Sequence, residues 1–317
     1  EYFDAAAQTN FLDLDAVLVG PAVRQTSAIF DDFWNSASVI PLAALSGAEE
    51  GALARLRAHG DAGYRSTRAA DYVARLRSSP GLPALVGGNA LHWLDEVGVY
   101  SDPAAKGQGE GKAQWLVHRL GRAMGLAKRE LRVISPYFVP GEEGTRWLVG
   151  KRAQGVDVSV LTNSLAANDV MAVHGGYAPY RVPLLEGGVT LYELMPHGRQ
   201  DSSLFGSSGA SLHTKALAVD AERGFIGSFN LDPRSVNLNT EMGILFRDRA
   251  ATAALLRSYE AKIAPDKSYR VRLLDGELRW DDASVAPPRT WDREPEASAW
   301  RRWTARAVGW LPIESQL

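Results

Sequence analysis

The stretch SLHTKALAVDAERGFIGSFNLD, residues 211–232, places a histidine, a lysine and an asparagine beside two short apolar runs. Alternate side chains of a strand share one face, so we expect His213 and Lys215 to point into the same space. The letters AERG predict a turn into a second strand, with Ser228 and Asn230 at its far end. The pattern therefore predicts two adjacent strands whose ends gather these four polar side chains.

These residue types suit a phosphodiester substrate. Lys215 and Asn230 can neutralise the non-bridging oxygens, on which charge builds in the transition state. His213 can attack phosphorus or protonate the leaving oxygen, and Ser228 can donate a hydrogen bond to phosphate or to the histidine network. We expect Glu241 to hold the other imidazole nitrogen of His213.

Composition limits the other classes of function. The 317 residues carry a formal net charge of −2, which gives no basic field for nucleic acid. The absence of cysteine excludes thiol catalysis and Cys-ligated metals. No apolar run approaches the roughly 18 residues of a membrane span. The opening EYFDAAAQTN lacks both Met and a charged-then-apolar leader, which predicts a fragment of a longer protein.

Strands and helices alternate along most of the chain, which predicts a layered α/β sheet. Strands are expected at 90–102, 156–164 and 189–195, a strand followed by a turn at 131–141, and helices at 20–36, 51–60, 66–79, 112–130, 145–155 and 180–188. A weak repeat lays residues 12–34 over residues 238–260, in the order acidic residue, strand, turn and helix. It aligns Asp15 with Glu241, so Asp15 is expected to be the counterpart of Glu241 from the first half of the protein.

The spacing H-x-K-x4-D-x6-G-S-x-N is the HKD signature of the phospholipase D superfamily, read here at His213, Lys215, Asp220, Ser228 and Asn230. The segments ISPYFVPG, HGGYAPYRVPLLEGGVTLYEL, NLDPRSVNLNTEMGILF and WLPIESQL resemble the bacterial cardiolipin synthases, the cardiolipin synthase C-like members in particular. Asp220 belongs to this set of catalytic-motif residues, although we expect it to anchor a turn.

The resemblance implies an α/β/α sandwich with a mixed sheet. Residues 1–85 would be the C-terminal remainder of a first lobe, and residues 86–317 a second lobe with the HKD motif and a Trp-rich end. It implies phosphatidyl transfer through a phosphohistidine, with no metal or cofactor. The expected partners are a phospholipid of the phosphatidylglycerol or phosphatidylethanolamine class and a membrane surface, and no nucleic acid. The expected location is the bacterial cell envelope, peripheral to the inner membrane.

The family uses two HKD motifs that face each other, and this sequence contains one. His213 would be the general acid, and the nucleophilic histidine would belong to a missing N-terminal half. We therefore expect little activity from the chain alone. A phospholipase D-type hydrolase, a single-motif homodimeric nuclease and a non-catalytic phosphate-binding module remain as alternatives.

Further residues are candidates for binding. Tyr137, His174, Tyr177 and Arg181 are predicted to shape a head-group pocket, with a solvated helix face as the alternative for the last three. KGQGEGK, residues 106–112, fails the phosphate-loop pattern and is predicted to be a flexible loop. Near the end of the chain, Trp300, Trp303, Ala307 and Trp310 fall on one helical face, which suits either an interfacial helix or packing against the domain.

Overall fold

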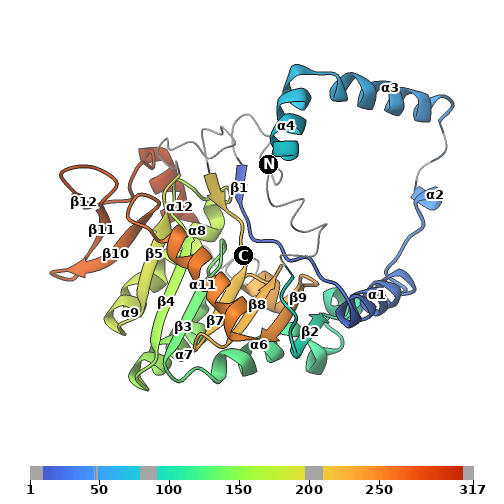
Figure 1. Cartoon of the computed structure of the whole chain (residues 1–317). Coiled ribbons are helices and arrows are strands. Elements are labelled where there is room, and N and C mark those ends of the chain that lie inside the picture. Colours follow the sequence, from blue (N-terminus) through green and yellow to red (C-terminus); the bar gives the residue numbers. More distant parts are fainter. Residues whose placement is uncertain (1–9, 46, 48, 79–90, 197–209, 310–317) are drawn as a thin grey trace.

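The computed structural model describes residues 10–45, 47, 49–78, 91–196 and 210–309. Its central feature is a ten-stranded sheet in the order β12-β11-β10-β5-β4-β3-β7-β8-β9-β2 (Figure 1). The strands are β2 (Glu96–Ser101), β3 (Glu130–Ile134), β4 (Asp157–Asn163), β5 (Thr190–Leu194), β7 (Ala216–Val219), β8 (Arg223–Gly227), β9 (Met242–Arg247), β10 (Ser268–Leu274), β11 (Glu277–Asp282) and β12 (Arg289–Trp291).

The sheet is mixed. β3, β4 and β5 pair in parallel, and the other neighbours are antiparallel. Parallel neighbours need crossover connections, and helices supply them here. The helices of this part are α6 (Leu116–Gly125), α7 (Gly141–Ala153), α8 (Met171–Tyr177), α9 (Arg181–Glu186), α10 (Pro233–Asn237), α11 (Arg249–Lys262) and α12 (Ala299–Gly309), with 3-10 turns η1 (Ala104–Gln108), η2 (Lys112–Gln114) and η3 (Ala178–Tyr180).

Apolar side chains cover both faces of the sheet. On one face α6, α7 and α9 pack against β3, β4 and β5 through Leu120, Leu148 and Leu184. On the other face α11 packs through Leu255 and Tyr259. The α/β/α sandwich with a mixed sheet, which the sequence predicted, is therefore confirmed.

The motif stretch is not one continuous strand. β6 (Ala210–Leu212) pairs in parallel with β1 (Asn10–Leu12) in a separate two-stranded sheet, and β7 enters the main sheet only at Ala216. The amides of His213 and Thr214 both donate to the carbonyl oxygen of Leu12, at 2.9 and 3.1 Å, which draws the chain away from the main sheet between the two strands. The alternation along β7 holds, since Leu217 and Val219 face one core while Ala216 and Ala218 face the other.

The N-terminal part contains α1 (Pro21–Trp34), α2 (Leu42–Leu45), α3 (Ala52–Tyr64) and α4 (Thr67–Ser78). α1 contacts the sheet edge, where Gln25 Oε1 accepts a hydrogen bond from the amide of Val99 at 2.8 Å. α2, α3 and α4 follow an arc away from the sheet (Figure 1). The expected strand after Leu12 does not form, and Val17 and Val19 are exposed.

The proposed repeat has one structural counterpart. Thr26 in α1 and Thr252 in α11 are 226 residues apart, the spacing of the repeat, and each hydroxyl donates to the carbonyl four residues earlier. Two other expected elements are shorter than predicted. The helix at 112–130 is α6 alone, and the strand at 90–102 is β2 alone.

Candidate active site

His213 is held by an acidic residue from the far N-terminal end of the described chain. Its Nδ1 lies 2.7 Å from Oδ2 of Asp13. Burial would raise the pKa of Asp13, but the hydrogen bond and the charges of His213 and Lys215 bring that pKa below its usual range. An ionised carboxylate only accepts hydrogen bonds, so Nδ1 carries a proton and Nε2 is the nitrogen available for proton transfer.

The prediction that Glu241 holds the imidazole of His213 is wrong. Asp13 occupies the place beside His213, whereas Asp15 is an exposed residue. The Glu241 carboxylate instead accepts from the hydroxyls of Ser228 at 2.5 Å and Ser235 at 2.9 Å. Glu241 is thus a support for the loop that follows β8.

Lys215 is a buried cation beside the histidine. Only 7% of its surface is exposed, and its Nζ donates to the carbonyl oxygen of His213 at 2.6 Å. Burial lowers its pKa to about 8, although the charges of Asp13, Glu241, Asp169 and Asp232 oppose that shift. The nearby carboxylates therefore do not fully offset the cost of burying the ammonium, and a bound phosphate oxygen would stabilise it.

Asn230 lies at the same edge of the sheet, because β8 ends beside the start of β7. The amide of Gly227 donates to the carbonyl of Lys215 at 3.1 Å, and a Cβ on Gly227 would come within 2.4 Å of the Met242 carbonyl oxygen. Only glycine allows this approach. The buried Oδ1 of Asn230 has no hydrogen-bond partner among the described residues, so the carboxamide can turn its NH₂ toward a substrate oxygen.

A buried ion pair supports the loop that follows β8. Lys106 and Asp102 are both fully buried, and Lys106 Nζ lies 2.7 Å from Asp102 Oδ2. The same Oδ2 accepts the amide of Glu241 at 2.9 Å, and Lys106 Nζ also donates to the carbonyl of Ser235 at 2.7 Å. The predicted flexible loop at residues 106–112 is therefore corrected in its first part, since Lys106 anchors the fold.

Asp220 lies at the opposite end of β7 from Lys215. Its carboxylate accepts the amides of Lys128, Arg129 and Glu130 at 2.8 to 3.2 Å. These bonds hold its pKa below the usual range despite partial burial. The expected turn anchor is found, and inclusion of Asp220 among the catalytic residues is corrected, because the strand separates it from His213.

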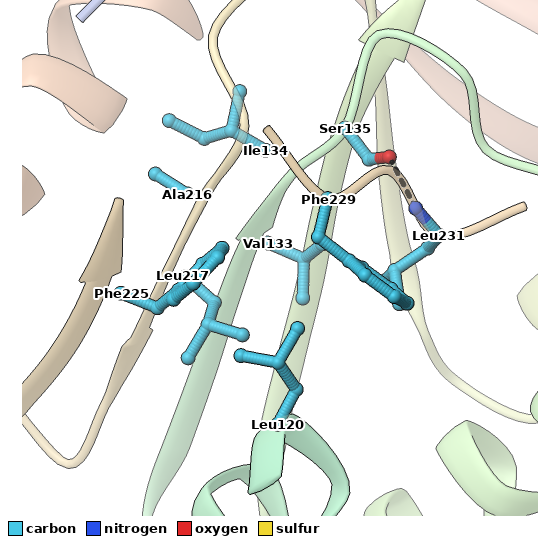
Figure 2. A pocket seen from close by; sticks show the side chains of 9 residues that line it. All are labelled: Leu120, Val133, Ile134, Ser135, Ala216, Leu217, Phe225, Phe229 and Leu231. Carbon is cyan, nitrogen blue, oxygen red and sulfur yellow. Dashed lines mark hydrogen bonds between the residues drawn. The ribbon is translucent and has the colours of Figure 1, made fainter. Parts of the chain in front are cut away.

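Tyr137 follows β3 and reaches the loop that carries Asp169. Its hydroxyl donates to the Asp169 carboxylate at 3.0 Å, and Asp169 acts electrostatically on Lys215. Ser135 ties this loop to the loop after β8, since its Oγ accepts the amide of Leu231 at 2.9 Å (Figure 2). The small cavity drawn there is apolar apart from Ser135, which identifies it as part of the core beneath the site.

The comparisons with known proteins agree on one family. Residues 120–263 match the model described as cardiolipin synthase, PLD-like domain. The chain is 37% identical over 321 residues to cardiolipin synthase C of Escherichia coli, covering 99% of this chain and 67% of that protein. The chain belongs to the cardiolipin synthase branch of the phospholipase D superfamily.

Further members of the superfamily match more weakly. Cardiolipin synthase A of Yersinia pseudotuberculosis is 29% identical over 226 residues, which cover 71% of this chain and 39% of that protein. A crystal structure of Nuc, a phospholipase D family member from Salmonella typhimurium, shares 17% identity at a TM-score of 0.41, over 56% of this chain and 98% of that one. The chain thus spans two thirds or less of the cardiolipin synthases named here.

Three residues of the predicted head-group pocket do not join the cardiolipin synthase-like site. His174, Tyr177 and Arg181 are buried, which also excludes the solvated helix face. They surround Glu294, which lies 2.6 Å from Arg181 Nη2 and 3.2 Å from His174 Nε2. The pocket lined by His174 and Arg181 includes neither His213 nor Lys215 in its lining, so these residues form a second cluster.

Sequence reasoning missed Asp13, Asp102 and Lys106. The repeat drew attention to Asp15, as the counterpart of Glu241, and gave no role to Asp13. For the buried pair, the only signal was an acid four residues before a lysine, a spacing equally usual on an exposed helix.

Proposed function

We propose that this chain carries one half of the active site of a phosphatidyltransferase of the cardiolipin synthase type. The observation that supports this most is the grouping of His213, held by Asp13, with a buried and under-compensated Lys215. Membership of the cardiolipin synthase family supports the same reaction class. The donor would be a phospholipid phosphodiester of the phosphatidylglycerol or phosphatidylethanolamine class.

In the proposed reaction, Lys215 and the Asn230 carboxamide bind the non-bridging oxygens of the donor phosphate. A second histidine attacks phosphorus, the bond to the leaving alcohol breaks, and that alcohol oxygen takes a proton from His213 Nε2. The acceptor hydroxyl then gives its proton to Nε2 and attacks phosphorus, and the phosphorus–nitrogen bond of the phosphohistidine breaks. Asp13 keeps the imidazole oriented and stabilises its protonated form.

The second histidine is proposed to come from another HKD unit. His59, His92 and His118 are exposed residues elsewhere, His174 is buried in the second cluster, and His197 lies outside the described residues. None of these five is followed two residues later by a lysine. An in-line displacement needs the nucleophile and the acid on opposite sides of phosphorus, which one histidine cannot provide. We therefore expect little turnover from the isolated chain.

Transfer assays test the proposed reaction and the requirement for a second histidine. A phosphatidylglycerol donor with a labelled acyl chain would be incubated with this chain alone, and with a protein extended upstream to include a second H-x-K. We expect cardiolipin from the extended protein and a phosphohistidine trapped by acid quench. Phosphatidic acid as the main product would favour the hydrolase, and rapid turnover by the monomeric short chain would refute the two-motif requirement.

Lys215 predicts a pH limit. Because its pKa is about 8 in the fold, the ammonium that binds phosphate is lost as pH rises through that value. We expect kcat/KM of the active protein to fall about tenfold from pH 7 to pH 9, as expected for loss of one proton. Lys215→Arg should shift this limb to higher pH if it retains activity, and an unchanged limb in that variant would assign the titration to another group.

The Trp-rich helix predicts membrane contact. Within the described residues, no helix combines the length and hydropathy needed to cross a bilayer. On α12, Trp300 and Trp303 are 66% and 61% exposed and stack with ring centroids 5.3 Å apart, an arrangement that suits the membrane interface. Trp310 lies outside the described residues.

We expect Trp300→Ala/Trp303→Ala to weaken binding to phosphatidylglycerol vesicles about tenfold in a flotation assay, as loss of two interfacial rings predicts. Trp93→Ala is the matched control, because Trp93 is 77% exposed outside α12. Equal vesicle binding by the double variant and the parent protein would show that this helix face does not contact lipid.

A further inference from the structure

A second pocket lies beneath α12, with a volume of about 400 Å³. We call it the α12 pocket. Its polar lining includes His174, Arg181, Glu294, Arg302 and Arg306, and Trp280 of β11 contributes to its wall. Volumes of this size accommodate small ligands. β11, which contributes Trp280, is five strands from β7 in the sheet order, and the lining of the pocket includes neither His213 nor Lys215.

The floor of the pocket holds buried polar groups with unused hydrogen-bonding capacity. Arg181 and His174 are 4% and 1% exposed. Arg181 pairs with Glu294 at 2.6 Å and with Glu193 at 3.3 Å. Even so, Arg181 Nε, His174 Nδ1 and Glu294 Oε2 have no hydrogen-bond partner within the described residues. Buried groups of this kind usually bond to protein, to ordered water or to a ligand, so these three atoms define the hydrogen bonds that a molecule bound here would complete.

The three atoms without a hydrogen-bond partner indicate which kind of ligand would fit. Burial would raise the pKa of Glu294, but Arg181 and His174 hold it well below its usual range, so the carboxylate is ionised and accepts. The proton on the His174–Glu294 hydrogen bond therefore lies on Nε2, and Nδ1 is the second polar atom of the ring. Arg181 Nε only donates. A ligand that both donates and accepts satisfies all three, and hydroxyl groups do so, whereas an ammonium cannot accept.

The rim of the pocket adds positive charge. Arg302 and Arg306 of α12 line the pocket, together with the acidic Glu277 and Asp292. Arg302 Nη1 donates to the carbonyl of Ala297, and Arg306 makes no ion pair or hydrogen bond within the described part of the chain. Arg293 also lines the pocket but has Asp292 at 3.7 Å. Guanidinium groups bind phosphate oxygens through paired N–H donors. The rim therefore suits a phosphate, and the floor suits hydroxyls.

α12 joins this pocket to the exposed tryptophans. The helix approaches α8 closely, since a Cβ on Gly175 would lie 2.6 Å from the carbonyl oxygen of Ala305. Arg301 fixes the helix through Nη2, which donates to the carbonyls of Leu165 and Asn168 at 2.9 and 2.5 Å. The same short helix thus presents Arg302 and Arg306 to the pocket and Trp300 and Trp303 to the surface, where aromatic rings favour lipid head groups.

We propose that the α12 pocket binds a phosphorylated polyol, the phosphate on Arg302 and Arg306 and the hydroxyls on His174, Arg181 and Glu294, as presented by a phosphatidylglycerol head group in a membrane. This lipid site is distinct from the transfer site. It holds the protein on membranes that contain the hydroxylated lipid.

Vesicle selectivity tests this proposal. Binding of the protein to vesicles with phosphatidylglycerol is compared with binding to vesicles with the same fraction of phosphatidylserine, which has the same net charge. We expect about tenfold preference for phosphatidylglycerol, the size of one good charge-assisted hydrogen-bond set. Ala178→Trp blocks the pocket without changing charge, since Ala178 lines it, and should abolish the preference. Arg302→Glu/Arg306→Glu should abolish it too.

A matched control separates the pocket from general electrostatics. Arg122→Glu/Lys128→Glu makes the same change of charge at exposed positions outside the pocket, and should keep the ratio between the two lipids. Free glycerol phosphate should compete for phosphatidylglycerol vesicles, and phosphoethanolamine should not. Equal binding of both vesicles, or an unchanged ratio in Ala178→Trp, would overturn the proposal. Binding of glycerol phosphate without vesicle preference would overturn the lipid assignment in favour of a soluble polyol phosphate. None of these variants alters His213 or Lys215, so transfer activity is judged separately.

Discussion

Replacement of His213 by asparagine is expected to lower kcat for phosphatidyl transfer at least about 10³-fold, the range for loss of a general acid–base group. The imidazole Nε2 is the proton donor in the first proposed step and the acceptor in the second, so both half-reactions lose their catalyst. KM for the donor lipid should change little, because Lys215 and Asn230 remain to bind the phosphate. The measurement is steady-state transfer from labelled phosphatidylglycerol in the protein form that has activity.

His118→Asn is the control for this variant, since His118 is an exposed residue on α6, outside the site. A residual rate of His213→Asn within tenfold of the parent protein would remove His213 from the chemistry. Single-turnover analysis adds a sharper test. If His213 is the acid and not the nucleophile, His213→Asn should still form the phosphohistidine with a donor whose leaving group needs no proton.

Asp13→Asn is expected to lower kcat by about 10²-fold to 10⁴-fold, the range for the loss of a carboxylate that orients an imidazole. The amide cannot stabilise the imidazolium, and it allows Nδ1 to lose its proton. Asp15→Asn is the control and should change kcat less than twofold, because Asp15 is an exposed residue and Asp13 is the observed partner of His213. Equal effects of both substitutions would contradict the arrangement at His213.

The contribution of the Asp13–His213 contact to the free energy of unfolding depends on pH, because the pKa of Asp13 is lowered in the folded protein. A group whose pKa falls on folding contributes stability above its unfolded pKa, which is about 3.9 for aspartate, and loses it as pH drops through the folded value. We expect the difference in unfolding free energy between the parent protein and Asp13→Asn to persist at neutral pH and to vanish in acid. Urea unfolding at a series of pH values measures it.

The sequence was informative about the sheet and about one edge of the site. The alternation of Leu217 and Val219 with Ala216 and Ala218 predicted the two faces of β7 correctly, because strand periodicity is a local property, but the predicted strand wrongly included His213 and Lys215. The partner of His213 was not predictable in this way. Asp13 directly follows β1, which ends at Leu12. The carbonyl of Leu12 accepts the amides of His213 and Thr214, which lie 201 and 202 positions away, so no local pattern indicates this contact.

The second cluster shows a different limit. His174, Tyr177 and Arg181 recur at helical spacing, which is compatible with a substrate pocket, with solvent or with burial. Burial depends on Glu193 and Glu294, one on β5 and the other in the segment after β12, and no local pattern connects them. Charged residues are rarely buried unless paired, so the outcome required knowledge of the partners.

The pairing of β1 with β6 affects when the site forms during folding. The contact between His213 and Asp13 spans 200 residues, and such distant contacts form slowly because a long loop must close first. The ten-stranded sheet contains no residue of β1, so it can assemble while the imidazole is still unoriented. The site would then become active late in folding. A protease that removes the β1 segment would abolish activity while the ten-stranded sheet stays folded.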